Sequence, residues 1–139
     1  MRHIRVHWCL FAVLLLPLSA PAMGISQQTY AVIRTLPRWE ARILMDVGQD
    51  YRLDGRALRL LFVIRKIENG GPGLEMGVLN GAARRHAGDS EKSLRLQASW
   101  AAGTIQKRFT GDLKTFAQRY CPADWPHWYR MAASWMERR

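Results

Sequence analysis

The sequence has few cysteines, few acids and no long apolar run. With only two cysteines, Cys9 and Cys121, in 139 residues, the chain cannot carry a framework of several disulfides. The one sustained apolar run, residues 9–18, is about ten residues long, whereas a membrane-spanning helix needs roughly twenty. The run is therefore too short to indicate a transmembrane helix.

The first 22 residues have the three parts of a secretory signal. Arg2 and Arg5 give a basic start, the apolar run follows, and an Ala-Pro-Ala ending predicts cleavage before Met23. An uncleaved N-terminal anchor is the alternative. Removal of 22 residues from 139 leaves 117, enough for one domain over residues 23–139. The sequence thus predicts a secreted or periplasmic protein, expected to be a monomer.

Cleavage would leave Cys121 as the remaining cysteine, so an internal disulfide is excluded. Cys121 follows Tyr120 and precedes Pro122, and we interpret it as a buried small apolar residue. A reactive thiol is the alternative, because such a role needs a charged neighbourhood that a sequence does not display.

The shortage of acids makes the chain strongly basic. Lys and Arg number 21 against 11 Asp and Glu, and the formal charge of +10 falls to +8 when Arg2 and Arg5 leave with the signal. An exported protein of this charge is expected to accumulate on polyanions such as anionic wall polymers or a membrane surface. Nucleic acid is not expected, because the chain is exported and has no base-reading motif. Most of the basic residues are scattered along the predicted helices and are interpreted as solvated faces.

Helical spacing of apolar residues runs through the rest of the chain and predicts a mainly α fold. Helices are expected over residues 26–36, 37–47, 55–67, 90–109, 112–120 and 124–137. Asp54, Asp89 or Ser90, and Asp112 precede three of them and are typical N-caps. No metal site or cofactor is predicted.

The helix over 55–67 is apolar on most sides and is expected to be the buried centre of the domain. It ends in Glu68, and the break at 69–73 follows at once because glycine adopts left-handed conformations and proline cannot continue a helix. A carboxyl group in this position is desolvated by its neighbours, which raises its pKa toward the range useful for proton donation. Glu68 is therefore the predicted catalytic acid.

The segment after this break is too short for a helix. Residues 73–80 are expected to form two short extended pieces, a β-hairpin or flap, and the polar, glycine-rich residues 81–89 a loop. Glu75 lies within the flap and is the candidate second catalytic carboxylate. A surface or flap-stabilising ion pair is the alternative for Glu75.

The order of elements resembles the lysozyme-like fold of soluble lytic transglycosylases and related peptidoglycan glucosaminidases. The resemblance spans about residues 54–131 and rests on Glu68, residues 76–80, Gly111-Asp112 and Tyr120-Cys121-Pro122. It implies a lysozyme-like helical domain with a short flap after the catalytic helix, which cleaves the glycan strands of peptidoglycan. It also implies that the substrate's own N-acetyl group can replace a second carboxylate.

Several residues are candidates for contact with the sugar, because aromatic faces stack on sugar rings and an amide can hydrogen-bond to an N-acetyl group. The substrate-binding candidates are Met76, Gly77, Val78, Asn80, Trp100 and Tyr120. Trp100, in the middle of a helix, has a core position as its alternative. For Glu68 the alternative is an ion pair with Arg65 or Lys66.

Three functions follow from these observations. The first is an exported glycosidase or lytic transglycosylase acting on peptidoglycan, with Glu68 as general acid and base. The second is a catalytically silent wall-binding or secretion-apparatus module of the same fold. The third is a basic helical protein that binds membrane or nucleic acid.

Overall fold

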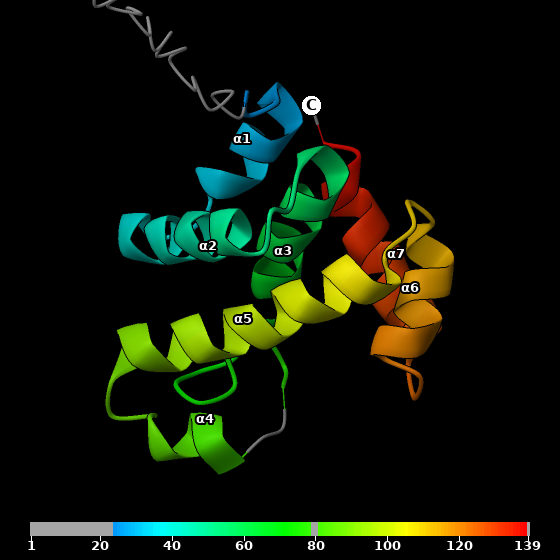
Figure 1. Ribbon diagram of the computed structural model, residues 1–139. Helices are drawn as coiled ribbons and strands as arrows, with labels where there is room; N and C mark the ends of the chain where they lie inside the picture. Colours follow the sequence, from blue (N-terminus) through cyan, green and yellow to red (C-terminus); the bar gives the residue numbers. More distant parts are fainter. Residues whose placement is uncertain (1–23, 79–80, 139) are drawn as a thin grey trace, which may run out of the picture.

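A computed structural model describes residues 24–78 and 81–138 of the chain. Within them the protein is helical and has no strand, so the prediction of a mainly α fold is confirmed (Figure 1). The helices are α1 (Gln27–Ile33), α2 (Arg38–Asp50), α3 (Gly55–Glu68), α4 (Gly81–Arg85), α5 (Ser90–Arg108), α6 (Leu113–Tyr120) and α7 (Trp125–Met136). The predicted signal sequence (1–22) and the predicted sugar contact Asn80 lie outside the described residues.

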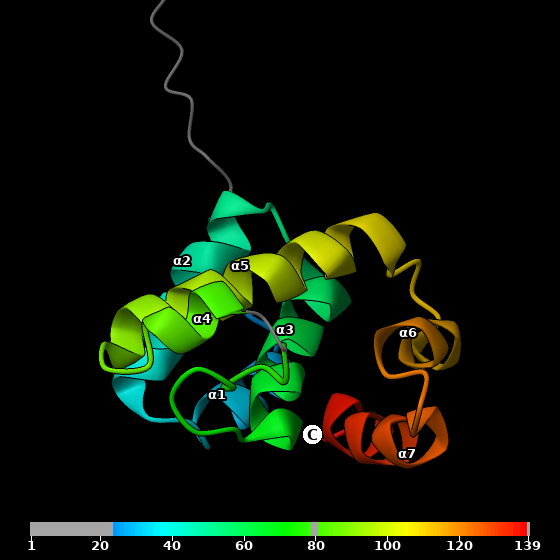
Figure 2. The same ribbon diagram turned by 90° about the horizontal axis from the view of Figure 1, so that it is seen from below.

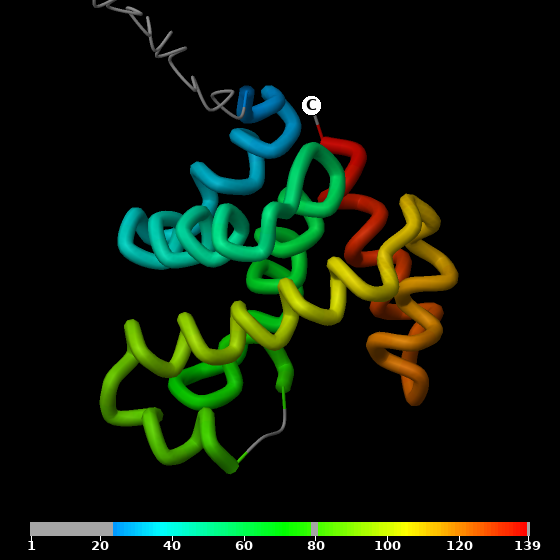
Figure 3. The backbone as a smooth tube through the Cα atoms, in the orientation of Figure 1, coloured from blue at the N-terminus to red at the C-terminus, as the bar shows by residue number. Residues whose placement is uncertain are grey.

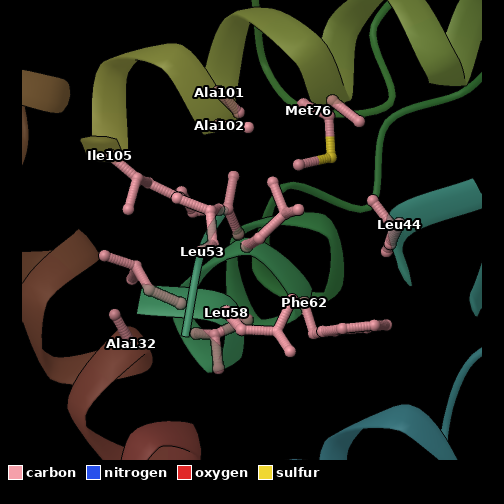
Figure 4. Packing of buried hydrophobic residues seen from close by; sticks show 14 of the residues in the cluster. Leu44, Leu53, Leu58, Phe62, Met76, Ala101, Ala102, Ile105 and Ala132 are labelled. Carbon is pink, nitrogen blue, oxygen red and sulfur yellow. The ribbon is translucent and has the colours of Figure 1, made fainter. Parts of the chain in front are cut away.

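Helix α3 is the centre of the fold, as its apolar sequence predicts. Its residues 60–64 are fully buried, and it packs against α1, α2, α5 and α7. The close-up in Figure 4 shows Leu58 and Phe62 of α3 among side chains from neighbouring elements, including Leu44 of α2 and Ala132 of α7. Burial of this one helix therefore fixes where its last residue, Glu68, lies.

Small residues let α5 cross close to α2 and α3. Ala98, Ala101 and Ala102 are buried on its inner face, where longer side chains would hold the helices apart. Helices α6 and α7 lie together on another side of α3, as the view from below shows (Figure 2). Helix α7 thus contacts the central helix α3, and α6 packs on α7.

Several predicted N-caps are present in the structure. Asp89 accepts a hydrogen bond from the Lys92 backbone N–H, and Asp112 accepts one from the Lys114 backbone N–H. Asp54 occupies the N-cap position of α3, but its side chain makes no capping hydrogen bond. Local capping chemistry therefore locates the starts of α5 and α6.

The segment between α3 and α5 differs from expectation. Its described residues 70–78 form two successive turns, closed by hydrogen bonds from Leu74 N–H to Gly71 O and from Gly77 N–H to Leu74 O, in place of the expected β-hairpin. This segment, the 70–78 loop, lies beside α5 (Figure 3). Side chains of α5 form hydrogen bonds with backbone groups of this loop, and these groups are then not available for pairing between strands.

The prediction of a loop over 81–89 is wrong for its first half, because residues 81–85 form the short helix α4. The loop was predicted because this stretch is rich in glycine and arginine. In the structure Ala83 is buried, and its packing against the rest of the domain stabilises the short helix. Within the described residues, no helix combines the length and the apolar character needed to cross a bilayer.

Candidate functional site

Glu68 is the last residue of α3, and the chain turns away immediately after it. The next residue, Asn69, is left-handed (φ 43°, ψ 30°), and its N–H bonds back to the Arg65 carbonyl. The sequence led us to expect glycine in this role, but asparagine also tolerates the left-handed region. The abrupt ending leaves the Glu68 side chain at the end of the helix.

The Glu68 carboxyl group is half-buried and accepts one hydrogen bond from a tryptophan. The indole N–H of Trp128, on α7, donates to Glu68 Oε1 at 2.9 Å. Desolvation raises the pKa of Glu68, and the Trp128 hydrogen bond lowers it to a smaller extent because it favours the charged form. The net direction is upward, toward a carboxyl group that holds its proton nearer to neutral pH.

The two neighbouring cations do not neutralise Glu68. Arg65 is buried and forms a bidentate ion pair with Glu40 of α2, with both N–O distances at 2.8 Å. Lys66 reaches the Thr35 carbonyl and lies over the ring of Trp135. The alternative interpretation, in which Arg65 or Lys66 pairs with Glu68, is therefore not what the structure shows.

Gly77 of the 70–78 loop packs directly on the Glu68 carboxyl group. A Cβ atom added at Gly77 would overlap Oε2 and Cδ of Glu68. Gly77 also has a positive φ of 70°, which other residues rarely adopt. Both the space and the backbone conformation therefore require glycine here.

Tyr120 of α6 completes the surroundings of Glu68. Its hydroxyl donates to the Met76 carbonyl at 3.1 Å, and its ring centroid lies 5.3 Å from that of Trp128. Burial, followed by the negative charges of Glu68 and Cys121, raises the pKa of the Tyr120 hydroxyl. We call Glu68, Met76, Gly77, Tyr120 and Trp128 the Glu68 cluster.

Two residues of α5 that sequence reasoning missed hold the 70–78 loop in place. Gln97 accepts from Met76 N–H at 2.7 Å and donates to the Gly73 carbonyl at 2.5 Å. Ser93 Oγ accepts from Gly73 N–H at 3.0 Å. Both side chains are fully buried, and their spacing of four residues puts them on one face of α5. Two polar residues four positions apart on the apolar face of a helix were the sequence feature that could have indicated this contact.

Glu75 belongs to this fastening and is not an exposed acid. It is 4% exposed, and its Oε2 accepts from Gly73 N–H at 3.0 Å and from Ser93 Oγ at 2.9 Å. Its Oε1 has no hydrogen-bond partner among the described residues, and its backbone carbonyl accepts from Arg65. The structure thus places Glu75 in a flap-stabilising position through hydrogen bonds, without the ion pair considered from the sequence.

The remaining predicted contacts are dispersed. Trp100 is half-buried and lines a hollow of about 430 Å³ with residues such as Tyr51 and Lys107, and no member of the Glu68 cluster lines that hollow. Val78 is half-buried beside Gly77. None of the five hollows measured on the described surface includes Glu68, and residues 79–80, which follow Val78, are outside the described part. Of the sugar-contact candidates, Gly77 packs on Glu68, and Tyr120 binds the Met76 carbonyl next to Gly77. The Met76 side chain is fully buried in the core, so the prediction that it contacts the sugar is wrong.

No family model, curated protein or solved structure matches this chain. Within residues 24–78 and 81–138, no group of three or more His, Cys, Asp or Glu side chains is arranged to hold a metal ion. The chemistry of the site must therefore be argued from the Glu68 cluster itself.

Proposed function

We propose that this protein cleaves the glycan strands of peptidoglycan, with Glu68 as the general acid. The observation that carries the proposal is the environment of Glu68: a half-buried carboxyl group with a raised pKa, held by Trp128 and covered by Gly77. Cleavage of a glycosidic bond needs an acid that is still protonated near neutral pH to protonate the leaving oxygen. The resemblance to lysozyme-like domains, carried by the same residues, supplies the substrate class.

Among the described residues, no cation forms an ion pair with Glu68, which is consistent with its raised pKa. A carboxylate at a helix C-terminus is disfavoured by the partial negative charge of the helix end. Trp128 supplies one neutral donor, while Arg65 and Lys66 are engaged elsewhere. The raised pKa favours the protonated form of Glu68. In our proposal this proton goes to the leaving group, and Glu68 later acts as the base.

We further propose that the substrate, not a second carboxylate, stabilises the positive charge that develops on the sugar ring. A retaining pair of carboxyl groups would lie roughly 5 Å apart and an inverting pair roughly 6.5 to 9.5 Å apart, both open to the sugar. Glu75 is buried and engaged with Gly73 and Ser93. Among the described residues, no other carboxylate is hydrogen-bonded into the Glu68 cluster. Assistance by the substrate's N-acetyl group fits this arrangement.

The experiment is to incubate the purified protein with peptidoglycan and identify the released fragments by mass. Glu68→Gln is expected to abolish release while leaving the helical circular dichroism spectrum unchanged. Glu91→Gln is the matched control, because Glu91 is an exposed acid in the first turn of α5. Anhydro-muramic ends would support substrate assistance, whereas reducing ends would indicate hydrolysis by water.

Two outcomes would contradict the enzyme proposal. Equal release by the wild type and Glu68→Gln would remove Glu68 from the chemistry. Binding to peptidoglycan without any release by the wild type would favour the catalytically silent wall-binding module.

A further inference from the structure

The far end of α3 carries a second unusual charged group, Arg59. Its side chain is buried, with 7% of the residue exposed, and the acceptors that its guanidinium binds among the described residues are all neutral. These acceptors are Thr29 Oγ1 at 3.4 Å, Met136 O at 2.7 Å, Ser26 Oγ at 3.1 Å and Gln28 Oε1 at 2.6 Å. Arg59 thereby ties α1 to the end of α7.

None of these bonds pairs the charge of Arg59 with an anion. A guanidinium has five N–H groups, and four hydrogen bonds are accounted for, which leaves one N–H on Nη1. Among the described residues, no carboxylate lies within ion-pair distance of Arg59. Buried charges in proteins are ordinarily paired, so a buried cation with only neutral partners points to an anion from outside the chain.

A second arginine lies beside the first. Arg56, three residues earlier on α3, is exposed and has no hydrogen-bond or ion-pair partner among the described residues. Burial, and then the charge of Arg56, lowers the pKa of Arg59. Two cations in the first turns of a helix also meet the positive end of its dipole. No ion pair to either arginine offsets this repulsion among the described residues.

The two arginines share a hollow of about 540 Å³ with Gln28, Met136 and Glu137. This volume lies within the range of about 300 to 1,000 Å³ found for small-molecule sites. Figure 1 shows the start of α3, helix α1 and the end of α7 meeting at the top of the molecule, next to the marked C-terminus. Because α3 has 14 residues, this end lies roughly 20 Å from Glu68 at 1.5 Å per residue.

We propose that this hollow binds a phosphate group through Arg56 and the free N–H of Arg59. A guanidinium presents a planar fork of donors that matches the oxygens of a phosphate, and an Arg–phosphate hydrogen bond is roughly twice as strong as a neutral one. The phosphate is that of a soluble phosphorylated molecule or of a lipid head group. The site goes beyond the proposed function, because it shares no residue with the Glu68 cluster.

Glu137 provides a second test of the proposal, because its carboxylate lines the same hollow and forms no ion pair with residues 24–78 and 81–138. An acid in this position repels a bound phosphate. Removal of that charge should therefore strengthen binding, whereas removal of Arg56 should weaken it. Both signs also follow from a change in net charge, so Arg56→Gln must act more strongly than removal of the same charge at a distant surface position.

The first test measures binding of inorganic phosphate to the full chain by calorimetry, with chloride at the same ionic strength as the reference. Arg56→Gln is expected to weaken phosphate binding about ten-fold or more, which corresponds to about 1.4 kcal/mol. Glu137→Gln is expected to tighten it. The matched control is Arg42→Gln, which removes the same charge from an exposed position on α2 and is expected to bind as the wild type does. Circular dichroism checks that each variant is folded.

The second test uses vesicles of phosphatidylcholine with and without phosphatidylglycerol. A greater loss of binding to the anionic vesicles with Arg56→Gln than with Arg42→Gln would identify a lipid head group as the source of the phosphate. Equal vesicle binding by the two variants, with weaker binding of inorganic phosphate by Arg56→Gln alone, would identify a soluble phosphate. No measurable binding of inorganic phosphate, or equal effects of both arginine substitutions on it, would overturn the site.

Discussion

Trp128 donates its indole N–H to Glu68 Oε1 at 2.9 Å, joining residues 60 positions apart in the sequence. Trp128 is 4% exposed and packs on the rings of Phe116 and Tyr120, so its direction is fixed by α6 and α7. This one bond gives the carboxylate form of Glu68 its support, while burial opposes that form. The balance between the two sets the pKa of Glu68, and under the proposed function it would set the pH range in which Glu68 is a general acid.

The first prediction concerns Trp128→Phe and the pH dependence of activity. The loss of the indole N–H removes support for the carboxylate, so the pKa of Glu68 rises further. A general acid works while it is protonated, and the alkaline limb of the pH–rate profile should therefore move to higher pH. The measurement is the rate of peptidoglycan cleavage across pH.

Trp135→Phe is the control for this prediction, because Trp135 lies on the same helix but faces Lys66 and Arg138. The alkaline limb of the pH–rate profile of Trp135→Phe should lie at the same pH as that of the wild type. A limb that moves to lower pH in Trp128→Phe would show that the indole does not stabilise the carboxylate.

The second prediction concerns the stability of Glu68→Gln. Because burial raises the pKa of Glu68 above the ordinary glutamate value of 4.5, the folded state holds the proton more tightly than the unfolded state. Above pH 4.5 the unfolded state releases its proton first, so stability falls as pH rises through the folded pKa. Glu68→Gln should therefore be at least as stable as the wild type at pH 7.

Urea unfolding at several pH values measures this effect. The gain from Glu68→Gln should be present at pH 7 and should disappear near pH 4, where the wild-type side chain is also uncharged. A variant that is less stable than the wild type at neutral pH would mean that the Glu68 carboxylate contributes favourably to the fold.

The third prediction concerns Gly77→Ala. The new methyl group would overlap the Glu68 carboxyl group, and alanine is strained at a φ of 70°. The substitution should cost more than about 1 kcal/mol of stability and displace the loop from Glu68, with loss of most activity. Gly71→Ala is the matched control, because a Cβ at Gly71 meets no atom within 4 Å. Equal stability and activity in the two variants would contradict the packing described here.

The fourth prediction concerns the fastening of the 70–78 loop by Gln97. Gln97→Ala leaves the Met76 N–H and the Gly73 carbonyl without partners in a buried position, which should cost at least about 2 kcal/mol. Activity should fall with it, because Gln97 acts through the position of Gly77 and does not touch Glu68. Urea unfolding and cleavage assays measure the two effects.

Gln106→Ala serves as the control for the fourth prediction. Gln106 is an exposed residue of the same helix, and its side chain donates to the Tyr51 carbonyl. Its removal should cost less than about 1 kcal/mol, because water replaces the lost hydrogen bond. A smaller loss from Gln97→Ala than from Gln106→Ala would show that the loop does not depend on α5.

The helices other than α4 could be predicted from the sequence because their signals are local. Apolar spacing marked the long helices, and Asp89 and Asp112 marked two starts. The conformation of residues 73–78, where we expected a hairpin, depends instead on contacts with a distant part of the sequence. Ser93 and Gln97 bind the backbone of Gly73 and Met76, and this contact depends on how α5 crosses the loop. The pattern of residues 73–80 alone does not indicate a contact with a helix about 20 residues later in the sequence.

By itself, the sequence determined that an acid ends the buried central helix, because burial of α3 follows from its apolar residues. Only the tertiary structure decided what surrounds that acid. Trp128 and Gly77 reach Glu68 from separate segments, whereas the nearby Arg65 forms its ion pair with Glu40 and not with Glu68. Hydrophobic periodicity is a property of neighbouring residues, but the pKa of a carboxyl group depends on groups brought together by packing.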